Sequence, residues 1–452
     1  MKDPKDLLIK EPELKDSDVK ESMDYCEGYK AFLDQAKTER EFVVKATEYL
    51  ENRGFVPFEK GKKYKFGDKV YKNHHGKSLF AFKVGENTDG AKIVASHIDS
   101  PRLDLKMKPL YEEAGLGYFK THYYGGIKKY QWTAIPLALH GVIAKKDGTV
   151  ITVSLGENET EPCFTVTDLL PHLAAEQSKR TLSEGIKGEE LNVLIGSLPF
   201  KTDDESNKVK LNIINLLGEK YGINEWDLFS AELNLVPAFK ARDIGFDASL
   251  IGAYGQDDKV CAYTSLTAFC SSSDKNTSVL VLADKEEIGS DGNTGLASSC
   301  LEYFLFDLAS SLDKNALDFI RASEAFSADV TAGFDPSFPG VYDKLNSAFI
   351  GKGAAIMKYT GARGKYDTSD ASAEFTAKVR DILDSAECVW QVAELGKVDE
   401  GGGGTVAKYL ARMDMNVIDI GVPVLSMHAP YEVTSKLDVF YTTKAFLAFL
   451  NY

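Results

Sequence analysis

The 452-residue chain lacks three features that would each assign it to a particular class of protein. Its six cysteines are scattered and form no CxxC pair, so we expect reduced, mostly buried thiols rather than a cysteine-based zinc site. No apolar run approaches the length of a membrane span. Positive charge is in deficit, because 53 Lys and Arg stand against 68 Asp and Glu for a net charge of -15. This balance argues against nucleic acid as the main partner.

The first residues, Met1-Lys2-Asp3-Pro4-Lys5-Asp6, are charged and contain no apolar core of a signal peptide. We therefore expect a soluble cytoplasmic protein that does not bind membranes. The apolar fraction of 44% and the charged fraction of 27% are ordinary for globular proteins. The length allows two domains.

Short apolar strands alternate with helical patterns along most of the chain. Strands are expected at residues 93–95, 278–283, 416–420 and 422–426. Helices are expected in the first fifty residues and over residues 260–272, 296–311, 370–395 and 405–413. Such alternation predicts an α/β fold with a mostly parallel sheet flanked by helices, whose ligands bind beyond the carboxyl ends of the strands. The glycine run 401–404 is expected to form a loop that opens a helix.

The middle of the chain has a different character. Residues 104–155 alternate in the manner of β-strands, and residues 156–235 hold polar loops and lysine-rich stretches. We interpret residues 104–240 as an inserted, β-rich domain. It splits one α/β domain into two chain segments, residues 1–103 and 241–452.

Five short segments place residues of the metal-ligand type after apolar runs. They lie at residues 95–99, 256–259, 284–289, 327–330 and 427–430. Together they supply two histidines, an aspartate able to bridge two ions, two further carboxylates and a spare glutamate. This set fits a pair of divalent cations and one general base.

Each segment taken alone has a plainer explanation. In an extended chain His97 and Asp99 point the same way, so the carboxylate could orient the imidazole, but an isolated pair of this kind is usually on the surface. Asp257 and Asp258 could bridge cations or could cap the following helix. Glu286-Glu287 could supply a ligand and a base, or could be a charged strand end.

The segments that contain Asp329 and His428 also have a plainer explanation when each is taken alone. Asp329 stands among small and apolar neighbours, where a cation or an arginine should compensate its charge. His428 follows an apolar strand, a position at which a lone histidine is usually structural. The hypothesis of a metal site depends on all five segments occurring together.

These segments resemble, in order, the motifs of the M18 family of metallo-aminopeptidases, the aspartyl aminopeptidase family. The matching stretches are Ser-His-Ile-Asp-Ser-Pro at 96–101, Asp-Asp at 257–258, Glu-Glu-Ile-Gly-Ser at 286–290, Ser-Ala-Asp at 327–329 and Met-His at 427–428. The resemblance covers essentially the whole chain. It implies a mixed sheet of the zinc-exopeptidase type, with an inserted dimerisation domain and a homododecamer built from dimers.

The resemblance also implies a role for each matching residue. His97 and Asp329 would hold one metal ion, and Glu287 and His428 the other. Asp257 would bridge the two ions, through a cis peptide to Asp258. The ions would be zinc, with cobalt or manganese as alternatives. Among the residues with catalytic roles, Asp99 would orient His97 and Glu286 would be the general base.

Two further assignments come from the resemblance. His172, within Leu-Pro-His-Leu-Ala at 170–174, resembles a histidine that reaches the neighbouring subunit's site and helps hold the substrate carbonyl. Lys358, Arg363 and Lys365 lie in the stretch that would read the substrate side chain, although its register differs from the family pattern and a solvated basic strand is the alternative.

The implied reaction is hydrolysis of the N-terminal residue from peptides with a free N-terminus, with a preference for Asp or Glu. Glu286 would take a proton from the attacking water. Two alternatives remain open at this point. One is a co-catalytic metal amidohydrolase or carboxypeptidase of the same fold, and the other is a non-catalytic, shell-forming scaffold.

Overall fold

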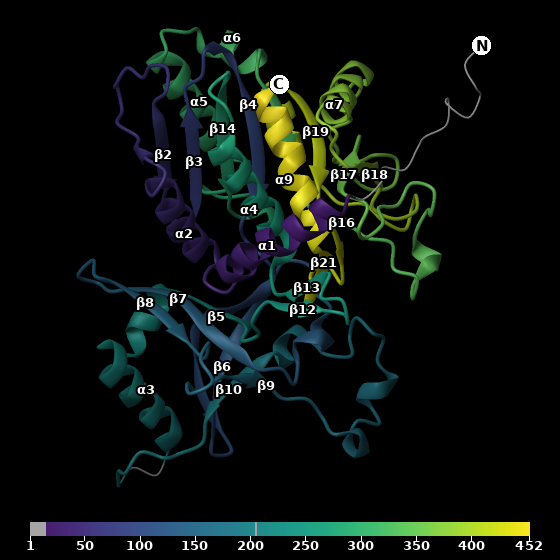
Figure 1. Ribbon diagram of the computed structural model, residues 1–452. Helices are drawn as coiled ribbons and strands as arrows, with labels where there is room; N and C mark the ends of the chain where they lie inside the picture. The colour runs from purple at the N-terminus through teal and green to yellow at the C-terminus, as the bar shows by residue number, and fades with distance from the viewer. Residues whose placement is uncertain (1–14, 204–205) are drawn as a thin grey trace.

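A nine-stranded mixed sheet organises the larger lobe of the computed structural model, which describes residues 15–203 and 206–452 (Figure 1). Its strands run in the order β1 (Val56–Pro57), β2 (Lys69–His74), β3 (Ser78–Lys83), β14 (Asn276–Ala283), β4 (Asn87–His97), β15 (Glu324–Ser327), β19 (Asn416–Gly421), β17 (Ala354–Met357) and β18 (Trp390–Val392). The central strands β14, β4, β15 and β19 are parallel to their neighbours within this group.

Helices cover both faces of this sheet because its central strands are apolar on both sides. Val94 of β4 and Leu280 of β14 face a core shared with α1 (Asp16–Leu33), α2 (Glu39–Glu51), α4 (Gln256–Ser271), α7 (Ala373–Ser385) and α9 (Lys436–Asn451). Ile93 and Val279, one residue earlier, face the opposite core with α5 (Cys300–Ser311), α6 (Ala316–Arg321) and α8 (Ala407–Ala411). A parallel sheet buried on both faces explains why the strands read as continuous hydrophobic runs.

The expected helix over residues 370–395 is wrong in its second half. Helix α7 begins after Ser372, whose hydroxyl accepts a hydrogen bond from the Phe375 amide, and ends at Ser385. The chain then turns at Glu387, and residues 390–392 form the edge strand β18 beside β17. Strand pairing of a stretch rich in valine and tryptophan overrides its helical spacing here.

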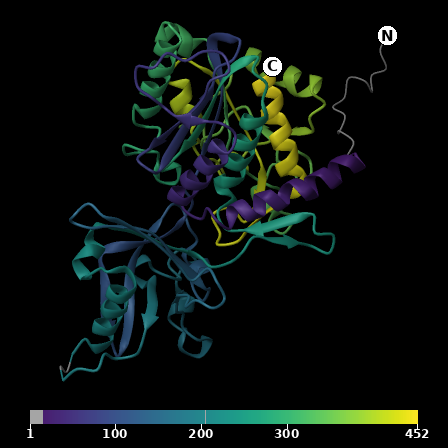
Figure 2. The same cartoon turned by 60° about the vertical axis from the view of Figure 1, so that its left-hand side comes forward.

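A second, smaller lobe lies below the first and is built around a seven-stranded antiparallel sheet (Figures 1 and 2). Its strands run in the order β8 (Val150–Leu155), β7 (Leu137–Ala144), β11 (Ala231–Pro237), β5 (Arg102–Glu113), β6 (Leu116–Tyr124), β10 (Asn192–Gly196) and β9 (Thr165–Val166), and α3 (Lys208–Tyr221) packs against it. These elements support the proposal that residues 104–240 form an inserted domain between the segments 1–103 and 241–452.

A five-stranded sheet lies at the junction of the two lobes (Figure 1). It runs in the order β12 (Arg242–Ile244), β13 (Leu250–Ala253), β21 (Glu432–Ser435), β20 (Pro423–Leu425) and β16 (Thr331–Ala332). Strand β13 leads directly into α4. Among residues 15–203 and 206–452, no helix combines the length and the apolar character needed to cross a membrane.

His140 joins the two lobes through a buried polar cluster. Its Nδ1 lies 2.7 Å from Glu41 Oε1 on α2, and its Nε2 lies 2.9 Å from Glu157 Oε1 in the smaller lobe. Glu157 also pairs with Lys37 at 2.8 Å and Lys240 at 3.0 Å. Burial lowers the pKa of His140, but its hydrogen bonds to Glu157 and Glu41 outweigh that effect and raise the pKa to about 9.

This cluster predicts a loss of stability in mild alkali. Because the folded-state pKa of His140 lies above its unfolded value of about 6.5, the stabilisation is complete below that pH and is lost as pH rises through about 9. The free energy of unfolding of the unmodified protein should exceed that of His140→Gln by about 3 kcal/mol at pH 6, and this difference should largely vanish by pH 9.5. The measurement is denaturant unfolding of both proteins across this range. His122→Gln, at an exposed position on β6, is the control and should show no such trend; a pH-independent difference for His140→Gln would contradict the assignment.

Candidate metal centre

Three of the five predicted ligand segments meet at one edge of the nine-stranded sheet. Strands β14, β4 and β15 are neighbours and parallel, so their carboxyl ends lie together. His97 is the last residue of β4. Glu286 and Glu287 begin the short 3-10 helix η7 (Glu286–Ile288) just after β14, and Asp329 follows β15. Parallel topology therefore places side chains from distant stretches of sequence side by side.

Asp257 lies between the two histidines. Its Oδ1 is 3.2 Å from His97 Nε2, and its Oδ2 is 3.1 Å from His428 Nε2. Glu287 Oε2 lies 3.4 Å from the same nitrogen of His428. The peptide bond between Asp257 and Asp258 is cis. Each oxygen of one carboxylate thus faces a different imidazole, which is the arrangement that a bridging ligand requires.

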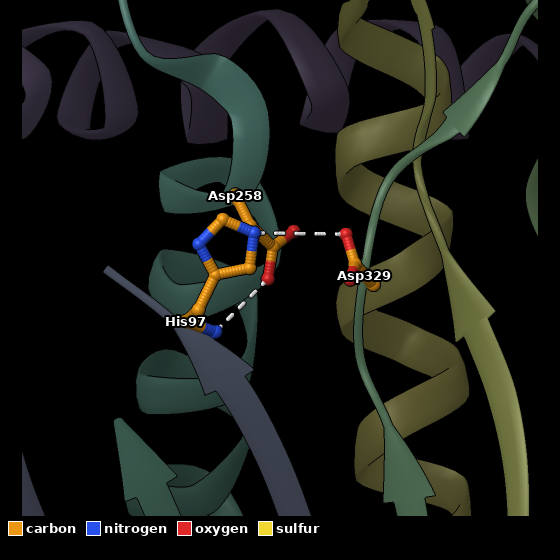
Figure 3. A group of neighbouring side chains, drawn as sticks. All are labelled: His97, Asp258 and Asp329. Atoms are coloured by element: carbon orange, nitrogen blue, oxygen red, sulfur yellow. Dashed lines mark hydrogen bonds and ion pairs between the residues drawn. The ribbon is translucent and has the colours of Figure 1, made fainter. Parts of the chain in front are cut away.

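Asp329 and Asp258 also lie beside His97 (Figure 3). Asp329 Oδ1 lies 3.8 Å from His97 Nε2, and Asp258 Oδ2 accepts a hydrogen bond of 3.3 Å from the His97 backbone amide. One ligand-type atom from each of His97, Asp258 and Asp329 lies within 4.8 Å of the others, and the same holds for His97, Asp257 and Glu287. Asp258 was not predicted as a ligand. Its only signal in the sequence was its place next to Asp257.

The carboxylates of this cluster are crowded and removed from water. Burial, reinforced by the neighbouring carboxylates, raises the pKa values of Asp329 and Glu287 well above their ordinary range. Burial also raises the pKa of Asp257, but its hydrogen bonds with His428 and His97 outweigh burial and leave that pKa below its ordinary value. Repulsion between buried carboxylates is what a bound cation would relieve.

The donor set fits divalent metal ions. Within the described part of the chain, the buried oxygens Asp258 Oδ1 and Glu287 Oε1 have no hydrogen-bond partner. Buried polar atoms are normally paired, so unpartnered carboxylate oxygens beside two imidazoles indicate that a further group completes the site. Neutral imidazole together with carboxylate oxygen suits zinc and also accommodates cobalt or manganese.

Asp99 ties the histidine strand to the glutamate turn. Its Oδ1 lies 3.3 Å from His97 Nδ1 and accepts a hydrogen bond of 3.1 Å from the Glu286 amide. Its Oδ2 accepts from the Glu287 amide at 3.2 Å and from the Tyr124 hydroxyl at 2.8 Å. Burial opposes its ionisation, but the contacts with His97 and Tyr124 outweigh burial and lower the pKa of Asp99. This fully buried carboxylate can therefore orient both His97 and the backbone that carries Glu286 and Glu287.

The smaller lobe contributes directly to the centre. Tyr124, the last residue of β6, donates a hydrogen bond from its hydroxyl group to Asp99. The carbonyl oxygen of Gly126 lies 2.7 Å from Nδ1 of His428 and can accept a hydrogen bond from it. Sequence reasoning missed both residues, because nothing near them in the chain indicates a partner more than a hundred residues away or on another lobe.

A cavity of about 430 Å³ opens beside the predicted ligands. Its wall includes Met357, Thr360, Leu395 and Met427, together with the glycine run at 402–404. Lys408 also lines the cavity, with its Nζ 2.8 Å from Asp367 Oδ2. The glycine loop expected from the sequence thus precedes α8 and also forms part of this wall.

Four residues that the resemblance assigns to substrate contact do not line this cavity. Lys358 and Lys365 each lie 2.9 Å from Asp370 and pair with that carboxylate. Arg363 lies in the same stretch, in a left-handed backbone conformation. His172 lies exposed in the 3-10 turn η3 (Pro171–Leu173) of the smaller lobe. The wall of the cavity contains none of these side chains among the residues described.

Comparisons with known proteins identify the family. The family model described as "Aminopeptidase I zinc metalloprotease (M18)" matches residues 32–450. A probable M18 family aminopeptidase 1 of Clostridium acetobutylicum is 50% identical over 447 residues, which cover 96% of each chain.

Solved structures agree with this family. The crystal structure of the M18 aminopeptidase of Thermotoga maritima matches with a TM-score of 0.93 and 42% identity, over 98% of this chain and 100% of that chain. A dodecamer of the S. cerevisiae protein mApe1 matches with a TM-score of 0.76 over 94% of this chain and 96% of that chain, and at 22% identity it shows the fold alone.

The expected α/β fold of the zinc-exopeptidase type is confirmed by these neighbours. The family model spans almost the whole chain, and relatives of known structure share its fold over nearly their full length. The chain belongs to the M18 family of aminopeptidases, which are zinc metalloproteases.

Proposed function

We propose that this aminopeptidase uses two metal ions held by five side chains. His97 and Asp329 would hold one ion, Glu287 and His428 the other, and Asp257 would bridge them. The observation that carries this proposal is the position of Asp257, whose two oxygens lie 3.2 Å and 3.1 Å from different histidines. When bound, the ions would polarise the scissile carbonyl and make the attacking water more acidic.

Glu286 is placed to move the proton. Its Oε2 lies 3.9 Å from His97 Nε2, and its side chain lines the cavity beside the predicted ligands. As general base it would take a proton from the water that attacks the carbonyl carbon. As the carbon–nitrogen bond breaks, it would return that proton to the leaving amine. Asp99 would hold the Glu286 backbone in place through the hydrogen bond that it accepts from this amide.

Family membership favours this reaction over the two alternatives. The metal cluster alone would serve an amidohydrolase or a carboxypeptidase equally well. Comparing peptides with free and acetylated N-termini separates these possibilities, because an aminopeptidase should cleave only the free ones. A purely structural scaffold would neither bind zinc at this cluster nor cleave either peptide.

Replacing Glu286 by Gln should abolish turnover but keep metal binding. The amide preserves the shape of the side chain and cannot accept the proton, so kcat should fall by about 10²–10⁴-fold. Hydrolysis of aminoacyl p-nitroanilides gives the rate, and elemental analysis gives the zinc content. Glu374→Gln, at an exposed position on α7, is the matched control. Near-native turnover of Glu286→Gln would remove this glutamate from the mechanism.

The preference for acidic N-terminal residues is the finer part of the proposal. Among the described residues, the cavity wall offers one lysine or arginine for this role, Lys408, which already pairs with Asp367. The wall also includes three apolar side chains, those of Met357, Leu395 and Met427. The resemblance implies this role for Lys358 and Lys365, but both instead pair with Asp370. An acidic side chain in this cavity would therefore have to compete with Asp367 for Lys408.

A panel of aminoacyl substrates tests this preference. If Lys408 receives the substrate carboxylate, Lys408→Met should lower kcat/KM for aspartyl and glutamyl substrates by about 10–100-fold, the loss expected for a hydrogen bond between charged groups. The value for leucyl substrates should change much less. If the unmodified enzyme cleaves leucyl or methionyl substrates faster than acidic ones, the acidic preference is wrong and the mechanism is unaffected.

We also propose that the smaller lobe mediates self-association into dimers and then a dodecamer. The dodecamer of S. cerevisiae mApe1 supports this by analogy of fold. The lobe exposes several leucines around the turn that carries His172, including Leu170, Leu173 and Leu182. Exposed apolar clusters of this kind typically mark protein interfaces. In such an assembly His172 could reach the cavity of a neighbouring subunit.

A mixing experiment tests this role of His172. His172→Ala and Glu286→Gln assemblies should each be nearly inactive. Dissociating and reassembling the two variants together should restore part of the activity, because some sites would combine an intact Glu286 with an intact His172 from the neighbour. Native mass spectrometry would report the assembly size. Mixed assemblies that remain inactive would place His172 outside the neighbouring subunit's site.

A further inference from the structure

We propose that Glu432 is a positioning residue that fixes the bridging Asp257 and the ligand His428 relative to each other. The inference rests on the two-metal site proposed above. Glu432 begins β21 and is fully buried. Its Oε2 accepts a hydrogen bond of 3.0 Å from the Asp257 amide, and its Oε1 accepts one of 2.8 Å from the His428 amide. One carboxylate therefore holds the backbones of two predicted ligands.

The two ligands come from elements that are far apart in the sequence and lie on either side of β21. Asp257 lies in the first turn of α4, which follows β13, whereas His428 lies in the loop between β20 and β21. Strand β21 pairs with β13 on one side and with β20 on the other. Glu432 is therefore anchored between the two elements, and each of its two oxygens accepts a backbone amide from a different ligand.

The conformation of His428 also depends on this contact. Its backbone has a φ of 65°, in the left-handed region that a residue with a side chain rarely adopts. Such a conformation costs on the order of 1 kcal/mol or more and persists where the surroundings hold it. The hydrogen bond from the His428 amide to Glu432 is one contact that holds it.

The Asp257 backbone is fixed on its other side by a second pair of residues. Its carbonyl oxygen accepts a hydrogen bond of 2.7 Å from Ser100 Oγ, which in turn accepts one from the ammonium group of the buried Lys259. The amide and the carbonyl of Asp257 are therefore both held by hydrogen bonds. This fixes the backbone from which its side-chain oxygens reach His97 and His428.

Glu432 should act on one metal position more than on the other. It contacts the backbones of Asp257 and His428, and Asp257 and His428 are two of the three residues that would hold the second ion. Within the described chain its carboxylate forms no hydrogen bond to His97 or Asp329. Loss of this positioning should therefore weaken binding of the second ion and leave binding of the first largely unchanged.

Zinc titration of the metal-free protein tests the inference. The unmodified protein should bind two ions per chain. Glu432→Gln should keep one tight position and bind the second ion about 10–100-fold more weakly, as expected for loss of a group that orients ligands. Activity at limiting zinc should fall, and excess zinc should restore most of kcat. A chelator-competition assay reports both dissociation constants independently of catalysis.

Asp438→Asn is the matched control. Asp438 is also a fully buried carboxylate near the C-terminus, and it accepts hydrogen bonds from backbone amides that include those of Gly351 and Gly353, each at 2.7 Å. Its replacement should lower the thermal midpoint of the metal-free protein and leave both zinc dissociation constants unchanged. If Glu432→Gln fails to fold, Glu432→Asp keeps the charge but cannot span both amides, and the same selective weakening is expected.

Three results would overturn the inference. Glu432→Gln could bind both ions as tightly as the unmodified protein, or it could weaken both equally. Asp438→Asn could weaken zinc binding to the same degree as Glu432→Gln, which would show a general effect of losing a buried carboxylate. A different result, fewer than two ions on the unmodified protein, would overturn the two-metal proposal itself together with this inference.

Discussion

Mutual repulsion among buried carboxylates is the constraint on which the rest of this structure depends. Asp257, Asp258, Glu287 and Asp329 lie within a few ångströms of His97 or His428 and are largely hidden from water. Burial raises the pKa values of Asp329 and Glu287, and the neighbouring carboxylates raise them further. The fold keeps these groups together by placing them on strand ends and helix starts whose positions are set by two apolar cores. The stability of the sheet thus supplies the free energy that concentrates charge at its edge.

The carboxyl ends of the strands could be located from the sequence because the pattern there is local. His97, Glu286 and Asp329 each follow a run of apolar residues, and a parallel sheet brings such run ends together whatever their separation along the chain. The same local reasoning failed between residues 386 and 395. Valines three residues apart match a helix, but pairing with β17 makes this stretch an edge strand. Periodicity reports which face of a segment is buried and does not report which neighbour buries it.

The residues that hold the ligands in place could not be found in this way. Glu432, Tyr124 and Gly126 act through hydrogen bonds to partners on other elements, and no spacing in the sequence marks them. The basic stretch from 358 to 365 shows the opposite case. Its charges suggested contact with substrate, but two of its lysines pair with Asp370, a residue whose position opposite them appears only in the folded chain. Charge along a sequence indicates available chemistry, and folding decides which partner receives it.

The hydrogen bonds from residues 124–126 make the catalytic centre a shared property of both lobes. The Tyr124 hydroxyl donates a hydrogen bond to Asp99, and the Gly126 carbonyl orients the ring of His428. Deleting or exchanging the smaller lobe would therefore remove hydrogen bonds that position the predicted metal ligands of the larger lobe. Changes in its strands that rotate β6 by even a small amount would be transmitted to both histidines. A substitution in either lobe near this point of contact would therefore have to preserve both hydrogen bonds to keep the two histidines in place.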